Sequence, residues 1–558
     1  MIFPIVQQSK ATGSYAVGPN DAICVRGAME EMFISRLRSA GHSCASDAKI
    51  KIETRIKNNR SHTYVEESRR VTDEKYFISS SFAGGSLWIK ISAGGKRGLY
   101  HACSNIIKQL SAGEIAIGEM CDYPLFATRG YIEGFYGNPW NTQERADMLR
   151  LMAFHGMNTY YYAPKDDPYH REKWDELYPA DELAALKRLI DLADRNCVSF
   201  FYCIAPGLGI KYSSDENYEK LLNKLLTLYD AGARGFGLLL DDIPSELYYE
   251  EDKEAFDGEA VNAHIYLTNR LYSDLKKLDP TVTLTLCPLE YHGKGDEYYI
   301  SKLGQNIPAS VRLFWTGKNI CSQELTEREA MFFSESTMHR PLYWDNFPVN
   351  DAEMYNEMHL GFITGRDRGL YRYSAGLISN CMEYCESSKI PLLTIADYLW
   401  NPEKYDEEAS WEYAIRTVTG EDADKFIWFA DYMLTSCLKV ENSPRLNAVL
   451  ERVETLSRAG DFAGAAAELR AYIICAQQCL NMMQRKDEKL YKEVKRWTRK
   501  FKVAIDILIL CAELIETQSA EKALMLRDSL AEYLSMPETF ADFSLRDTAE
   551  TTLRLLNM

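Results

Sequence analysis

The sequence lacks several features that would identify other classes of protein. No uncharged apolar run approaches the ~18 residues that a membrane-spanning helix needs, so we expect no membrane partner. The first residues show no basic segment followed by an apolar core and a small-residue cleavage site, which predicts a cytoplasmic location unless a leader has been removed. The 9 histidines form no HxH or HExxH arrangement, so we expect neither a metal site nor another cofactor.

Positive charge is also scarce, and cysteine does not follow a disulfide pattern. The formal net charge of -17 disfavours nucleic acid or an anionic membrane surface as a partner. The 14 cysteines are scattered and several lie in apolar runs, which is typical of buried, reduced thiols. With 46% hydrophobic and 12% aromatic residues, the chain is globular, and its 558 residues allow roughly three or four domains.

The chain divides into three regions by composition. Residues 1–122 alternate short β-like runs with amphipathic stretches, which predicts a small α/β domain. Residues 123–405 form a central region. In residues 406–558 glycine and proline become sparse and apolar residues recur at helical spacing, which predicts a helical bundle.

The central region contains eight short β-like runs separated mostly by helical patterns. This repetition is typical of a (β/α)8 TIM barrel. A doubly wound open sheet is the alternative, but no glycine-rich nucleotide loop follows the first run. The runs are RGYIEG from Arg129, TYYYAP from Thr159, SFFYCIAP from Ser199, GFGLLLDD from Gly235, TLTLCPLEY from Thr283, VRLFWTG from Val311, PLYWDN from Pro341 and GLISN from Gly376.

Two adjacent carboxylates, Asp241 and Asp242, end the fourth run. Neighbouring residues on a strand point to opposite faces, so both can serve one site only if the chain leaves the pleat there. A polar turn or a cap of the next helix is the simpler interpretation of the pair. In a barrel, however, catalytic residues lie at the C-terminal strand ends, and the other runs also end in polar or special residues.

Adjacent carboxylates favour one type of glycoside hydrolysis. Most glycosidases place two carboxyl groups on either side of the scissile bond, but enzymes acting on 2-acetamido sugars can use the sugar's own acetamide oxygen as nucleophile. One carboxylate then orients and polarises the acetamide N–H, and a second carboxylic acid protonates the leaving oxygen. These tasks lie close together in space, and neighbouring residues at a strand end can perform both.

The central region resembles glycoside hydrolase family 84, the family of O-GlcNAcases and bacterial β-N-acetylglucosaminidases, which also carries a hyaluronidase name. An exo-acting pocket would not suit cleavage of hyaluronan at internal bonds. The resemblance covers all eight expected strand ends in order. It lies in RGYIEGFYGNPW, YYYAPKDDPYHREKW, LLLDDIP, CPLEY, FWTG, YWDNFPVND and GLISNCMEYCESSKIPLLTIADYLWNP. The regions before and after the barrel are similar in placement to the family's flanking domains. One departure is Cys381, where many relatives have proline, so this turn is expected to differ.

The resemblance implies a role for each of twelve residues. Asp241 would polarise the acetamide, and Asp242 would be the general acid/base. Tyr291 would hydrogen-bond the acetamide oxygen or the oxazoline formed from it. The other roles are contacts to the outer hydroxyls by Gly134, Lys165, Asp351 and Asn380, a place beside the acetamide and anomeric region for Asn346, the acetamide pocket wall for Trp344, Cys287 and Thr316, and the pocket entrance for Tyr136.

These roles predict a retaining exo-β-N-acetylglucosaminidase that acts through an oxazoline on a terminal β-linked GlcNAc of a glycopeptide or glycan. A β-N-acetylhexosaminidase of the Asp-Glu type is an alternative, but Asp242 stands where that family has glutamate. A catalytically silent acetamido-sugar-binding protein is a second alternative, disfavoured by the retention of both aspartates and Tyr291. Asp166 and Asp167 are expected to be structural.

Overall fold

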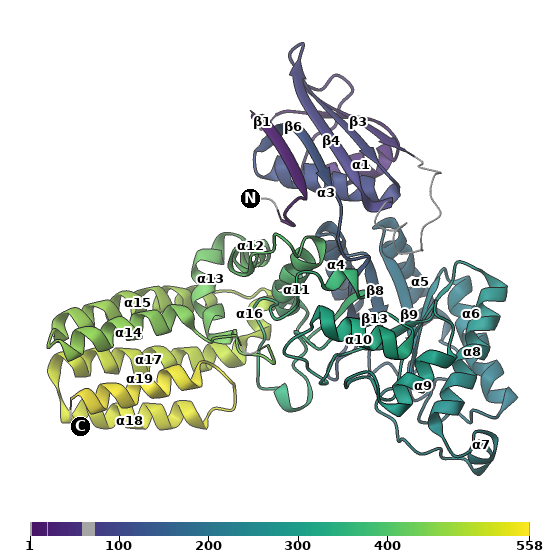
Figure 1. Cartoon of the computed structure of the whole chain (residues 1–558). Helices are drawn as coiled ribbons and strands as arrows, with labels where there is room; N and C mark the ends of the chain where they lie inside the picture. The colour runs from purple at the N-terminus through teal and green to yellow at the C-terminus, as the bar shows by residue number, and fades with distance from the viewer. Residues whose placement is uncertain (1–2, 19, 58–72, 439, 557–558) are drawn as a thin grey trace.

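The computed structural model describes residues 3–18, 20–57, 73–438 and 440–556, and it begins with a mixed sheet (Figure 1). The strand order is β1-β6-β4-β5-β3-β2. In β3, IKIETRI, apolar and polar residues alternate at the start, so Ile50 and Ile52 are buried in the core shared with α1 and α3, while Lys51 between them is only partly buried. The elements are β1 (Gln8–Ala16), β2 (Ile23–Gly27), α1 (Glu30–Ser39), β3 (Ile50–Ile56), β4 (Tyr76–Ala83), β5 (Ser86–Ala93), α3 (Lys96–Ser111) and β6 (Glu114–Asp122).

A closed barrel of eight parallel strands follows, in the cyclic order β7 to β14. The predicted (β/α)8 fold is therefore confirmed. The strands are β7 (Thr128–Glu133), β8 (Thr159–Tyr162), β9 (Ser199–Ile204), β10 (Gly235–Leu239), β11 (Thr283–Cys287), β12 (Arg312–Trp315), β13 (Pro341–Asp345) and β14 (Gly376–Asn380). The helices are α4 (Thr142–Phe154), α5 (Ala180–Arg195), α6 (Asp215–Asp230), α7 (Glu250–Ala255), α8 (Ala260–Leu278), α9 (Tyr298–Asn306), α10 (Glu327–Thr337) and α11 (Cys385–Trp400).

The two glycines of GFGLLL have a packing role in this barrel. Strand β10 is buried on both faces, so its sequence is apolar throughout instead of alternating. A Cβ on Gly235 would lie 2.7 Å from the Phe201 ring, and one on Gly237 would lie 2.5 Å from the Cys203 Sγ. Glycine therefore makes room for larger side chains of β9 inside the barrel.

The chain ends in helices that run side by side away from the barrel (Figure 1). In α17 the buried Ile505, Leu508, Ala512 and Ile515 recur at helical spacing, as the sequence pattern predicts. Across the described residues, no helix is both long and apolar enough to cross a membrane. The helices after the barrel are α12 (Glu407–Thr419), α13 (Ala423–Ala430), α14 (Pro444–Arg458), α15 (Phe462–Met483), α16 (Lys489–Glu493), α17 (Lys495–Thr517), α18 (Ala520–Ser535) and α19 (Asp542–Leu555).

Buried polar contacts join the N-terminal sheet region to the barrel. Glu74 forms an ion pair with Arg129, at the start of β7, and accepts a hydrogen bond from the Asn158 amide at 2.9 Å. Trp400, at the end of α11, donates to Asp122 at 3.0 Å. The predicted domain limits fall in the connections from β6 to β7 and from α11 to α12, and they stay predictions.

Candidate active site

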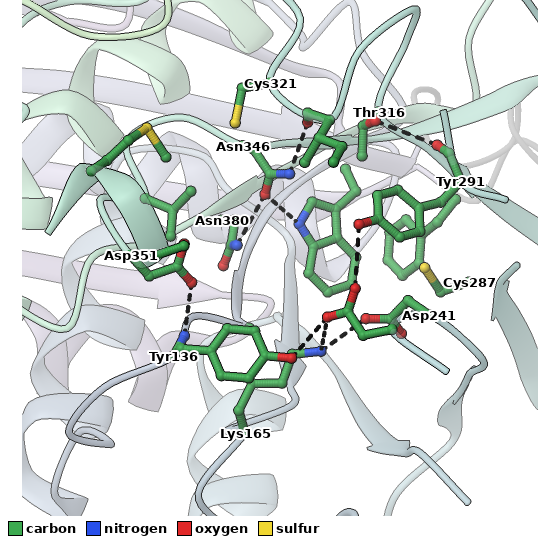
Figure 2. A pocket seen from close by; sticks show the side chains of 18 of the residues that line it. Tyr136, Lys165, Asp241, Cys287, Tyr291, Thr316, Cys321, Asn346, Asp351 and Asn380 are labelled. Atoms are coloured by element: carbon green, nitrogen blue, oxygen red, sulfur yellow. Dashed lines mark hydrogen bonds and ion pairs between the residues drawn. The ribbon is translucent and has the colours of Figure 1, made fainter. Parts of the chain in front are cut away.

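The C-terminal ends of the barrel strands surround a pocket of about 470 Å³ (Figure 2). All twelve residues singled out from the sequence line it, although they come from seven different segments, which end or follow every strand except β9. Their assigned roles remain predictions. The twelve are Gly134, Tyr136, Lys165, Asp241, Asp242, Cys287, Tyr291, Thr316, Trp344, Asn346, Asp351 and Asn380.

Asp241 is a buried carboxylate held by a buried lysine. Its side chain is only 8% exposed, and Lys165 Nζ lies 2.8 Å from its Oδ2. Burial by itself would raise the pKa of Asp241, but the charge and hydrogen bond of Lys165 lower it below its ordinary value. The same pairing raises the pKa of Lys165 against the opposing effect of burial. The pair is therefore ionised at neutral pH.

Asp242 faces the same pocket because the chain leaves the strand at this residue. Strand β10 ends at Leu239, and Asp242 adopts a left-handed backbone conformation with φ of 54°. The Asp242 side chain is 37% exposed. Tyr136 Oη donates to its Oδ2 at 2.8 Å and Tyr291 Oη to its Oδ1 at 3.3 Å. Two neighbouring aspartates thus enter one site in different surroundings. Asp241 is buried and lies 2.8 Å from Lys165 Nζ, whereas the more exposed Asp242 lies 3.9 Å from the same nitrogen and accepts hydrogen bonds from two phenols.

Two buried acceptors at the pocket are left without a hydrogen-bond partner among the described residues. They are Asp241 Oδ1 and Asn380 Oδ1. The Asn380 amide nitrogen donates instead to Asn346 Oδ1 at 3.0 Å, and Trp344 Nε1 donates to the same oxygen at 2.9 Å. Buried polar atoms in native proteins are nearly always paired. The two free oxygens therefore suit a ligand that brings N–H or O–H donors.

Aromatic side chains form one wall of the pocket, and Gly134 makes room for them. A Cβ at Gly134 would lie 2.7 Å from Trp344 Cζ2. Trp344 meets Phe314 edge to face, with ring centroids 5.2 Å apart. Cys287 completes this side, and burial raises the pKa of its thiol well above the ordinary value, so it is an inert wall group. In the part of the chain that the structure describes, no three His, Cys, Asp or Glu side chains are grouped to hold a metal ion.

A comparison with protein families decides the classification. The sequence profile of β-N-acetylglucosaminidases (NAGidase) matches residues 129–431, more than half of the chain. The chain belongs to the β-N-acetylglucosaminidase family. It is therefore a member of a glycoside hydrolase family, and the resemblance to family 84 is confirmed.

Similar proteins with assigned names support this classification. The protein is 32% identical over 275 residues to the protein O-GlcNAcase of Rattus norvegicus, covering 48% of this chain and 29% of the rat protein. It resembles the solved structure of a mutant O-GlcNAc hydrolase of Thermobaculum terrenum, with TM-score 0.72 and 32% identity over 77% of this chain and 95% of that one. The structure of CpGH84B matches with TM-score 0.85 and 25% identity, covering 99% of this chain and 100% of the other. The chain thus spans less than a third of the rat relative and the whole of CpGH84B.

Several pocket residues of this family member were missed by sequence reasoning. Two of them lie in strand β12 itself, and the others lie in irregular segments after β12 and β13, including the 3-10 helix η1 (Ala352–Met354), where no hydrophobic period marks a residue as important. The C-terminal helical region also reaches the site, because Cys437 Sγ contacts the Asn346 carbonyl oxygen at 3.6 Å. The missed lining residues are Phe314, Trp315, Ile320, Cys321, Val349, Ala352, Glu353 and Met354.

In the loop after β8, Asp167 has a structural role, as expected. Asp167 accepts hydrogen bonds from the phenols of Tyr162 at 2.8 Å and Tyr178 at 2.6 Å, and it does not line the pocket. At the family's proline position, the buried Cys381 donates its backbone N–H to the Ile132 carbonyl at 3.3 Å. Proline has no such donor and could not make this bond, and the expected difference from relatives with proline stays a prediction.

Proposed function

We propose that this protein is a retaining exo-β-N-acetylglucosaminidase that hydrolyses a terminal β-linked GlcNAc with the sugar's own acetamide as nucleophile. The observation that carries the proposal is the contrast between the adjacent carboxylates. Asp241 is buried and charged beside Lys165, whereas Asp242 is half-exposed beside the phenols of Tyr136 and Tyr291. Substrate-assisted hydrolysis needs one permanently ionised carboxylate and one that exchanges a proton.

In the first step Asp241 Oδ1, which has no partner in the described structure, accepts the acetamide N–H. The acetamide oxygen then attacks the anomeric carbon and the C1–O bond to the aglycone breaks. Asp242 gives its proton to the departing oxygen, and Tyr291 donates to the acetamide oxygen as the oxazoline forms. The proton on nitrogen stays in the hydrogen bond to Asp241, so this carboxylate balances the charge that develops on the ring.

In the second step Asp242, now a carboxylate, takes a proton from water as that water attacks the anomeric carbon. The oxazoline opens and the acetamide is restored. Two inversions at one carbon give net retention of configuration. The outer hydroxyls would bind Lys165, Asp351 and Asn380, whose unpaired Oδ1 suits a hydroxyl donor.

The aglycone is proposed to be a protein or peptide side chain, with a glycan as the second candidate. The 32% identity of the barrel region to an O-GlcNAcase supports this order. A cytoplasmic enzyme would meet such substrates, and the 14 unpaired cysteines suit a reducing compartment. Hydrolysis of a β-GlcNAc-serine peptide compared with a chitin oligosaccharide separates the two substrate classes.

The alternatives make different predictions. A silent sugar-binding protein would not release 4-nitrophenol from 4-nitrophenyl N-acetyl-β-glucosaminide. If an enzyme carboxylate were the nucleophile, the rate would not depend on the nucleophilicity of the acetamide oxygen. We therefore expect the rate to fall steeply and monotonically as the acetamide methyl carries one, two and three fluorine atoms, because each fluorine weakens the internal nucleophile. A flat series would overturn the substrate-assisted proposal.

A further inference from the structure

A positively charged side chain outside the pocket binds both Asp242 and its tyrosine partner. Arg171 lies on the loop between β8 and α5, and it does not line the pocket. Its Nη1 donates to Tyr136 Oη at 3.0 Å, and its Nη2 donates to the backbone carbonyl of Asp242 at 3.2 Å. Tyr136 Oη in turn donates to Asp242 Oδ2 at 2.8 Å. One guanidinium thus contacts the backbone of the acid directly and its carboxylate through a phenol.

The loop that carries Arg171 is itself fixed. Lys224 is fully buried and donates to the carbonyls of Tyr169 at 2.5 Å and Lys173 at 3.0 Å, on either side of Arg171. The preceding residue, His170, is buried, and its carbonyl accepts the Ala205 N–H at the end of β9 at 2.9 Å. The guanidinium is therefore presented from a rigid support, as a group that sets a distance must be.

Asp242 needs such support because its backbone is strained. A non-glycine residue in the left-handed region is strained and persists only where its surroundings hold it there. Tyr136 and Asp242 follow different strands, β7 and β10, so nothing in the local chain fixes one relative to the other. Arg171 bridges the two loops by planar, forked hydrogen bonds of the kind that only arginine provides.

We propose that Arg171 is a positioning residue for the general acid/base. It fixes the carboxylate of Asp242 at the glycosidic oxygen and polarises the Tyr136 hydroxyl that stabilises the carboxylate after proton transfer. This inference rests on the proposed function, because it requires Asp242 to move a proton. Its effect must therefore be largest where proton donation limits the rate.

The test is Arg171→Gln in the full chain, assayed with aryl N-acetyl-β-glucosaminides of graded leaving-group acidity. We expect kcat/KM to fall about 10- to 100-fold for the least acidic phenol, the size of one lost charge-assisted hydrogen bond. For 4-nitrophenol, which needs little acid assistance, we expect less than about threefold loss. The matched control is Lys173→Gln, which removes one charge from the same loop; its side chain is 49% exposed, and we expect unchanged rates.

A double variant separates positioning from general damage. With a phenol of intermediate acidity that Asp242→Asn still releases, adding Arg171→Gln should cost less than about twofold, because the acid through which Arg171 acts is already gone. Equal losses across all leaving groups, or a full further loss in the Asp242→Asn background, would overturn the proposal. If Arg171→Gln does not fold, Tyr136→Phe removes the bridging oxygen alone and must show the same leaving-group dependence. Absence of any turnover by the unaltered protein would instead refute the proposed function.

Discussion

Replacing Lys165 by methionine should shift the pH dependence of both catalysis and stability, because it removes the partner of a buried charge. Lys165 Nζ lies 2.8 Å from Asp241 Oδ2, and both side chains are more than nine-tenths buried. Methionine has a similar length and no charge, so the pocket wall is kept. The other polar group that favours ionised Asp241 by hydrogen bonding is its own backbone N–H. Burial, the largest influence on this carboxyl, would then act almost unopposed and raise its pKa.

The size of the effect follows from the cost of an unpaired buried charge. Removing one partner of a buried ion pair typically costs about 3–5 kcal/mol. Asp241 can avoid this cost by binding a proton, and each pH unit corresponds to about 1.4 kcal/mol. The acid limb of kcat/KM should therefore move upward by about 2 to 4 pH units. Below this raised pKa the variant would hold Asp241 protonated, unable to polarise an acetamide N–H.

Thermal stability gives an independent measurement with a definite sign. In the native protein the pKa of folded Asp241 is below its unfolded value, so the pair adds stability above that value and loses it as the pH falls. In Lys165→Met the folded pKa lies above the unfolded one, so stability falls as the pH rises from about 4 toward neutrality. The difference in melting temperature between the two proteins should widen over this range.

A second substitution provides the control. Adding Asp241→Asn to Lys165→Met leaves a neutral amide in place of the orphaned carboxyl, so the widening with pH should disappear. The reasoning would be refuted by a melting-temperature difference that stays constant from pH 4 to 8. It would equally be refuted by an unmoved acid limb in Lys165→Met, since Lys165 would then not be the group that keeps Asp241 ionised.

Three further perturbations test other parts of the structure. Gly134→Ala should lower kcat/KM about 10-fold or more on the aryl substrate with little change in melting temperature, because its Cβ would lie 2.7 Å from the Trp344 ring; unchanged kinetics would contradict this. Cys321 is partly exposed and its pKa is lowered by a hydrogen bond with the neighbouring thiol of Cys437, so it should be alkylated before the buried Cys287, and a pocket ligand should protect it. Peptide mass mapping would measure the order, and alkylation of Cys287 before Cys321 would contradict this prediction. Glu74→Gln should destabilise the protein by about 3–5 kcal/mol, because it leaves a buried arginine unpaired, while the folded enzyme keeps its kcat/KM; an unaltered melting curve would argue against it.

The barrel could be predicted because its strands carry an unambiguous pattern. The expected strand starts and the observed ones differ by at most one residue. Strands buried on both faces must be apolar throughout, and helices that cover them must be amphipathic, so the alternation of the two patterns is visible in sequence. Closure of the sheet then brings all the strand ends to one mouth, which is why residues from distant motifs such as Gly134 and Asn380 line one pocket.

Other elements give no such signal. Strand β1 (Gln8–Ala16) is polar and exposed almost throughout, so no apolar run or alternation in its sequence predicts a strand. It is held in the sheet by its pairing with β6. The irregular segment that contributes Ala352 and Met354 to the pocket is shaped by local turns, with Ala352 itself at φ of 50°. Alanine rarely adopts the left-handed conformation, so its presence in the sequence does not predict one. Such loops are determined by long-range contacts that one sequence does not reveal.

The adjacent aspartates separate what the sequence could predict about the site from what it could not. Their place at one pocket could be predicted from residue type and position, because the C-terminal ends of barrel strands meet at one mouth, whereas their catalytic roles stay predictions. The arrangement that makes both usable could not be inferred, since it depends on the left-handed conformation of Asp242. That conformation costs about 1–3 kcal/mol, and hydrogen bonds to a charged group contribute about 1.5–3 kcal/mol each. The donors to Asp242 come from Tyr136, Arg171 and Tyr291, in segments 49 to 106 residues away in the chain. The strain at Asp242 is thus offset by contacts that exist only once the barrel has closed.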